Sequence, residues 1–168
     1  AVVNNDYHAL TTELAVGFKD FISPDAPDIY PEELRADIDA LNVIIYADFN
    51  LAVNLAALVT NQKDYEYYYD RIFARLDWLE ERLSKQRYLM GDTITDSDIR
   101  IFPTLARFDL VFYQKYLVNK KRLVDYPNLW NYAKDLYSNP AFGGTTDFDS
   151  MRKRFYYVDH TPFEDLPR

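Results

Sequence analysis

The stretch Gly91-Asp92-Thr93-Ile94-Thr95-Asp96-Ser97-Asp98-Ile99 carries the most specific structural signal in the chain. Thr95 is placed to cap a helix, and Asp98, three residues later, can accept a hydrogen bond from the Thr95 amide, an acidic variant of the capping box. Ile94 and Ile99 have the spacing of a hydrophobic staple. We therefore predict a buried central helix starting at Thr95, and we expect Thr95→Ala or Asp98→Ala each to cost about 1 kcal/mol.

Length and composition set the class of protein. A chain of 168 residues is most simply one domain with a real core. Its net charge of −8 opposes binding to nucleic acid and to anionic lipid. There is no Cys, which excludes disulfides, thiolate metal sites and a cysteine nucleophile within this sequence. The longest apolar run, Leu51–Val59, is interrupted by Asn54, so we expect no transmembrane segment.

Helical periodicity recurs along the whole sequence, and alternation of period two does not. The pattern predicts a first helix with an apolar stripe of four residues (Leu10, Leu14, Phe18, Phe21), then helices over 31–58 with a bend near Asn50, 63–83, 99–116, 129–136 and 148–157. We predict an all-α helical bundle of about seven helices, with residues 1–158 forming the domain and 159–168 an irregular tail.

Few residues are arranged for chemistry. His8 and His160 have no partner at metal-ligand spacing, and a capped helix start explains the acidic run Asp92–Asp98, so we predict no metal site. The rings of Tyr65–Tyr69 surround a helix, which leaves packing and a partner surface equally open. Arg152–Tyr157 interleaves basic and aromatic residues, which favours an anionic or aromatic ligand there over nucleic acid.

With Tyr-Leu-Met before it, the opening stretch resembles the capping box and staple in the C-terminal helical domain of glutathione transferases. Other segments, in order, resemble one branch of that family, the glutathionyl-hydroquinone reductases (xi class). The resemblance covers residues 28 to 158 and marks Arg107, Phe108 and Asp109 as a family signature. The matching segments are Tyr30–Arg35, Ile38–Asn42, Asp98–Phe102, Leu105–Asp109, Tyr126–Trp130, Asp135–Tyr137 and Met151–Tyr157.

The resemblance implies where the chemistry of the family lies. Its catalytic cysteine and its glutathione site belong to a thioredoxin-like N-terminal domain, which we expect to be absent here. We therefore expect no catalytic residue and no cofactor in this chain, with glutathione bound only if that domain is present. The helical domain of the family contributes two tyrosines to a quinone pocket. One falls at Asn54 and is lost, and the other survives in the pair Tyr156 and Tyr157, which we take as the substrate-binding residues.

Two interpretations follow. We favour a non-catalytic scaffold or accessory subunit of a larger assembly, because a helical domain without its usual neighbour exposes an apolar face that needs partner subunits or a homodimer. The alternative is the C-terminal, acceptor-site half of a glutathionyl-hydroquinone reductase or glutathione transferase. An adaptor built on the same fold is a third reading. The start at Ala1 suggests processing, which would suit import into a plastid or mitochondrion.

Overall fold

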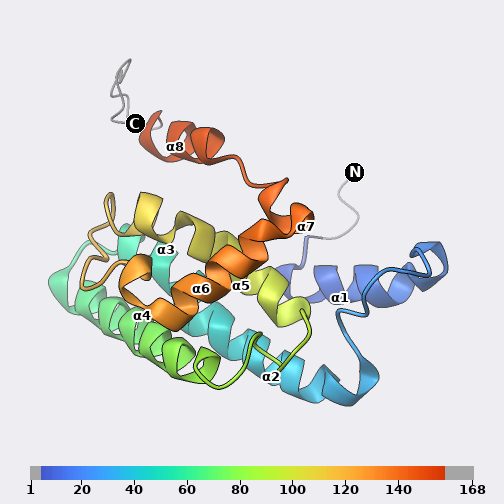
Figure 1. Ribbon diagram of the computed structural model, residues 1–168. Helices are drawn as coiled ribbons and strands as arrows, with labels where there is room; N and C mark the ends of the chain where they lie inside the picture. The colour runs from blue at the N-terminus through green and yellow to red at the C-terminus, as the bar shows by residue number, and fades with distance from the viewer. Residues whose placement is uncertain (1–4, 158–168) are drawn as a thin grey trace.

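The central helix α5 runs from Asp96 to Arg107 in the computed structural model, which describes residues 5–157 of the chain (Figure 1). It contacts α2 (Arg35–Ile45) on one side and α6 (Pro127–Ser138) on another. The longest helix, α4 (Gln62–Leu83), packs against α3 (Ala52–Leu58) and α6. The prediction of an all-α bundle organised around the helix that follows Thr95 is confirmed.

Residues 5–157 contain eight α-helical segments. Because α2 and α3 are joined through one π turn and form one continuous helical segment, the prediction of about seven helices is also confirmed. Asn139 follows the end of α6, and Pro140 begins a further short helix, because proline suits a first helical position. The remaining helices are α1 (Tyr7–Gly17), α7 (Pro140–Gly143) and α8 (Phe148–Tyr157), with short 3₁₀ turns at Lys19–Phe21, Glu32–Leu34 and Leu123–Asp125.

Two π turns change the course of the helices. Tyr46–Asn50 links α2 to α3, where the sequence predicts a bend. Phe108–Phe112 follows α5, so the helix predicted over 99–116 departs from regular α geometry at Phe108, one turn after the Pro103 at which a bend is expected. A π turn widens the helix by one residue and re-aims its side chains. Each turn contributes one fully buried phenylalanine, Phe49 and Phe108, whose ring centroids lie 5.9 Å apart.

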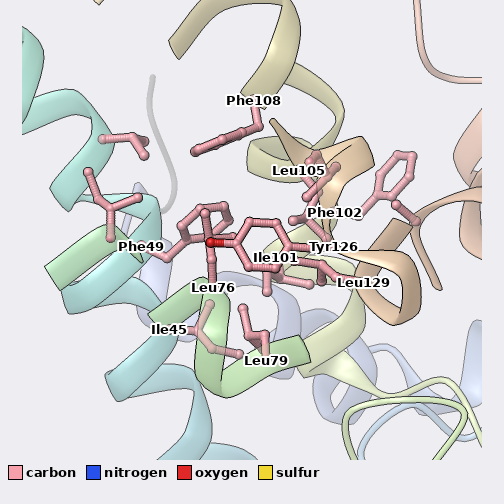
Figure 2. Close-up of a cluster of buried hydrophobic side chains, with 14 of the residues drawn as sticks. Ile45, Phe49, Leu76, Leu79, Ile101, Phe102, Leu105, Phe108, Tyr126 and Leu129 are labelled. Carbon is pink, nitrogen blue, oxygen red and sulfur yellow. The ribbon is translucent and has the colours of Figure 1, made fainter. Parts of the chain in front are cut away.

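The core gathers side chains from α2, α4, α5 and α6 around these two rings (Figure 2). Tyr126 and Leu129 enter it from the start of α6, opposite Ile45 of α2 and Leu76 of α4. Full burial of one such side chain contributes about 1.5–3 kcal/mol. The labelled residues are Ile45, Phe49, Leu76, Leu79, Ile101, Phe102, Leu105, Phe108, Tyr126 and Leu129.

The continuous helical segment Glu32–Leu58 is long and apolar enough to meet a simple test for a membrane span. The interruption of the apolar run at Asn54 predicts no transmembrane segment, but the segment as a whole still meets this test. The segment supplies one wall of the bundle core, with Ile38, Ile45 and Val53 fully buried. A core helix passes the same test of length and composition, so the segment is weak evidence for a membrane protein.

The first helix differs from the rest of the bundle. Its predicted apolar stripe faces solvent in the described chain, with exposed fractions of 41% for Leu10 and 49% for Leu14. Phe18, just before the 3₁₀ turn that follows, is 55% exposed, and Phe21, at the end of that turn, is 85% exposed. A contiguous apolar surface of this kind is typical of a contact with another protein surface.

Candidate functional site

The start of α5 is a buried hydrogen-bonding centre. The Asp98 carboxylate accepts from the Thr95 amide at 2.8 Å and from the Thr95 hydroxyl at 3.0 Å. Its other oxygen accepts from the Leu89 amide at 3.0 Å and from the Tyr132 hydroxyl at 2.7 Å. Burial raises the pKa of Asp98, and these hydrogen bonds oppose that shift without cancelling it. The capping box thus ties α5 to α6 and to the link that precedes it; Ile94 and Ile99 beside it pack against the core.

A second polar group in the same turn joins three helices. Arg100 forms a buried ion pair with Asp96 at 2.6 Å, and Asn42 of α2 donates to the same carboxylate oxygen at 2.8 Å. The guanidinium also donates to the Tyr7 carbonyl at 3.0 Å and to the Thr11 hydroxyl at 2.6 Å, both in α1. The position of Asp96 in the first turn of a capped helix does not by itself predict these contacts. Its spacing of four residues from Arg100 was the signal that was missed.

The signature residues Arg107, Phe108 and Asp109 lie where α5 passes into its π turn, and the structure gives them packing contacts. Phe108 is fully buried. Arg107 donates to the Pro103 carbonyl at 2.6 Å, and burial lowers its pKa. Asp109 accepts from the Leu123 amide at 2.6 Å, while burial raises the pKa of its carboxyl group. The Asp109 contact holds the loop before α6 in place, and the Arg107 contact stays within α5.

The tyrosine pair lies at the end of α8, which packs on the π turn after α5. The Tyr156 hydroxyl donates to the Leu110 carbonyl at 2.9 Å, and burial raises its pKa, so it is a neutral phenol at physiological pH. The Lys115 ammonium lies 5.7 Å from the centre of the Tyr156 ring. Tyr157 is the last residue of α8, and its side chain lies outside the description.

Among the described residues, no cluster of three or more His, Asp or Glu side chains is arranged to hold a metal ion. The side chain of His8 and the whole of His160 lie outside the described residues, as does the predicted tail 159–168. The Asn54 amide donates to the Asn50 carbonyl at 2.7 Å, which fixes it to its own helix.

Comparison with known proteins defines the class first. Residues 62–135 match the family described as glutathione S-transferase, C-terminal domain. A glutathione transferase from Gordonia bronchialis is 41% identical and superimposes with a TM-score of 0.93, over 99% of this chain and 53% of that one. The protein therefore has the fold of the C-terminal helical domain of glutathione transferases.

The chain is also similar to one branch of that class. The glutathionyl-hydroquinone reductase PcpF of Sphingobium chlorophenolicum is 34% identical over 155 residues, which are 92% of this chain and 49% of PcpF. The glutathione-bound structure of YqjG from Escherichia coli is 33% identical, with a TM-score of 0.87 over 93% of this chain and 50% of that one. The chain is closely related to glutathionyl-hydroquinone reductases and xi-class transferases, and it spans about half the length of the curated relatives it matches.

These relatives support the alternative interpretation, the C-terminal half of a reductase or transferase, better than the favoured interpretation of a non-catalytic scaffold. Nothing in them supports a non-catalytic scaffold, because the proteins similar to this chain carry the names of reductases and transferases. The scaffold interpretation gave great weight to the missing thioredoxin-like domain and the absent Cys. Since the likeness extends over only half of each relative, those absences do not separate an enzyme from a scaffold.

Proposed function

We propose that this chain is the C-terminal helical part of a glutathione-dependent reductase or transferase of the xi class, and that it holds the aromatic acceptor at Tyr156 and Tyr157. The observation that carries the proposal is the extent of the likeness: the match to PcpF covers 92% of the chain, so it extends well beyond the general transferase region at 62–135. Glutathione and the reacting thiol would then be supplied by a thioredoxin-like domain.

The geometry around Tyr156 suits a role in positioning a ring. Its hydroxyl donates to the Leu110 carbonyl, so the face of the ring, rather than the hydroxyl, would contact an acceptor. A flat quinone or hydroquinone stacks favourably on such a face. The ammonium of Lys115 beside that ring favours the phenolate form of a hydroquinone.

The proposal is tested by measuring the glutathione-dependent reduction of a glutathionyl-hydroquinone by the protein as the cell makes it. Tyr156→Ala should lower kcat/KM about tenfold, the value of one lost aromatic contact of about 1–1.5 kcal/mol, and Tyr156→Phe should change it little. Tyr67→Ala, which removes an exposed ring of α4, is the matched control. Absence of turnover in the unmodified protein would return the interpretation to a non-catalytic role.

A second role, contact with another protein surface, is favoured by the exposed stripe of α1. Leu10, Leu14, Phe18 and Phe21 present apolar side chains that the described chain does not cover. Either a thioredoxin-like domain, a partner subunit or a second copy would bury them. A purified chain that stays monomeric at high concentration, with no loss of solubility, would contradict this role.

A further inference from the structure

A groove of about 490 Å³ lies between α5, α6 and α8. Its volume is in the range of about 300–1,000 Å³ that is typical of small-molecule sites. Tyr156 is not one of the residues that line it; the tyrosine adjoins the groove through the hydrogen bond of its hydroxyl to the carbonyl of Leu110, which does line it. The acceptor contact proposed at Tyr156 and Tyr157 does not use the groove.

Aromatic rings form much of the groove. Trp130 and Tyr137 line it from α6, and Phe102 lines it from α5. Phe148 lines it from α8, and its ring centroid lies 5.8 Å from that of Tyr137, so these two rings meet where α6 and α8 approach. Tyr137 is 44% exposed and Phe148 is 36% exposed, which is high for rings this large. Such walls favour a flat aromatic ligand over an extended polar one.

The charges at the groove are biased toward binding an anion. Lys134 lines it with its ammonium 5.8 Å from the centre of the Trp130 ring, and within residues 5–157 the structure records no carboxylate bound to that ammonium. Arg152 also lines it, and its ion pair with Asp149 is solvent-exposed and therefore weak.

The one acidic group of the groove does not offset these cations. Asp109 is engaged by the Leu123 amide at 2.6 Å, and a second backbone amide, that of Val124, also bonds to it. Its carboxylate is thereby held against the start of the 3₁₀ turn Leu123–Asp125. The groove thus combines apolar walls with Lys134 and Arg152, on a protein whose net charge of −8 is otherwise unfavourable to anions.

We propose that the groove between α5, α6 and α8 is a binding site for a small aromatic carboxylate, with its ring between the aromatic walls and its anionic group at Lys134 and Arg152. The ring supplies most of the affinity through burial of apolar area. The two cations supply the preference for an anion over a neutral molecule of the same shape.

The test compares 2-naphthoate with its neutral analogue 2-naphthylmethanol. The protein has two tryptophans, so Trp78→Phe leaves Trp130 as the only one and makes its fluorescence a reporter of the groove. In that background Lys134→Gln should weaken 2-naphthoate binding about tenfold, and Arg152→Gln about three- to tenfold, which corresponds to loss of one charge-assisted contact. Lys121→Gln, which removes a cation outside the groove, should leave binding unchanged.

Two further measurements decide the outcome. Ala106→Phe places a ring in the groove and should abolish binding of both probes, while circular dichroism and the thermal midpoint report whether the fold is kept. Equal weakening of the acid and the alcohol by Lys134→Gln, or binding that survives Ala106→Phe in a folded protein, would overturn the proposal. So would binding that appears only after removal of residues 158–168, because the chain's own C-terminal segment would then be the occupant.

Discussion

The helices α4 and α5 begin in the same way and are placed in opposite surroundings. Asn61 caps α4 and Thr95 caps α5, both with extended backbone, and each is followed three residues later by an aspartate. In α4 the Asn61 side chain accepts from the Asp64 amide at 3.0 Å, and both residues are exposed. In α5 Thr95 and its partner Asp98 are fully buried.

The likeness extends one turn further. Gln62, first in α4, bonds to Glu66 four residues on at 2.8 Å, and Asp96, first in α5, pairs with Arg100 at the same spacing. The pair in α4 is exposed and local. The pair in α5 also bonds to α1 and α2. The same arrangement, a cap followed by two bonded side chains four residues apart, therefore stabilises only its own helix in α4. In α5 it also connects the helix to α1 and α2.

The largest expected difference in stability comes from the side chains four residues after the first residue of each helix, Arg100 in α5 and Glu66 in α4. Arg100→Met leaves the Asp96 carboxylate buried with Asn42 as its one recorded side-chain donor, and should cost about 3–5 kcal/mol of unfolding free energy. Glu66→Met at the matching position of α4 should cost less than about 0.5 kcal/mol. Urea unfolding with an unchanged m-value measures both.

Two controls sharpen that comparison. Asp96→Asn combined with Arg100→Met removes the buried charge as well as its partner, and should recover most of the lost stability. Hydrogen exchange of the α1 amides should be accelerated in Arg100→Met, because Arg100 holds the Tyr7 carbonyl and the Thr11 hydroxyl. Equal stability losses in the single and double variants would mean that the ion pair is not what stabilises this turn.

The aspartates three residues after the caps should give the next largest difference. Asp98→Ala leaves the Leu89 amide and the Tyr132 hydroxyl without their acceptor inside the protein, in addition to the cap, and should cost at least about 3 kcal/mol. This exceeds the loss of about 1 kcal/mol expected from a cap alone. Asp64→Ala in α4 should cost less than about 1 kcal/mol. Similar unfolding midpoints for the two variants would show that Asp98 acts only as a local cap.

The two caps should differ by less than the two aspartates do. Thr95→Ala removes a buried hydroxyl and methyl group and should cost about 1–2 kcal/mol, whereas Asn61→Ala should cost about 0.5–1 kcal/mol. The reason for the small gap is that each cap serves chiefly its own helix. Thermal unfolding of the two variants side by side measures it, and a larger loss in Asn61→Ala would reverse the ranking of the two helix starts.

This comparison also shows what the sequence can predict. The cap at Thr95, the helices and the transferase-like fold depend on local spacing and on ordered motifs, which a sequence displays. The partners of Asp98 and Arg100 lie up to 93 positions away, at Tyr7, and no local pattern indicates them. The groove lined by Lys134 and Arg152 is hidden for the same reason, since it forms only when α6 and α8 meet α5.

The smallest effect is a pH dependence that distinguishes the buried carboxylate of Asp98 from the partly buried, ion-paired carboxylate of Asp48. Burial raises the pKa of Asp98, so its folded form keeps a proton that the unfolded chain loses near pH 3.9, and its contribution to stability declines as pH rises through the folded pKa. Burial also raises the pKa of Asp48, but hydrogen bonds from Arg75 and Arg71 outweigh it and lower the pKa overall. Its contribution declines as pH falls through the folded pKa.

The two carboxylates should therefore show opposite trends between about pH 3 and pH 6, with each unit of pKa shift worth about 1.4 kcal/mol. On acidification, the stability gap between the unmodified protein and Asp98→Asn should widen, and the gap to Asp48→Asn should narrow. Parallel trends would mean that the four hydrogen bonds to Asp98 outweigh its burial. In that case Asp98 would be stabilised in its charged form, as Asp48 is by its ion pairs. The difference in burial between the two carboxylates would then not decide how stability depends on pH.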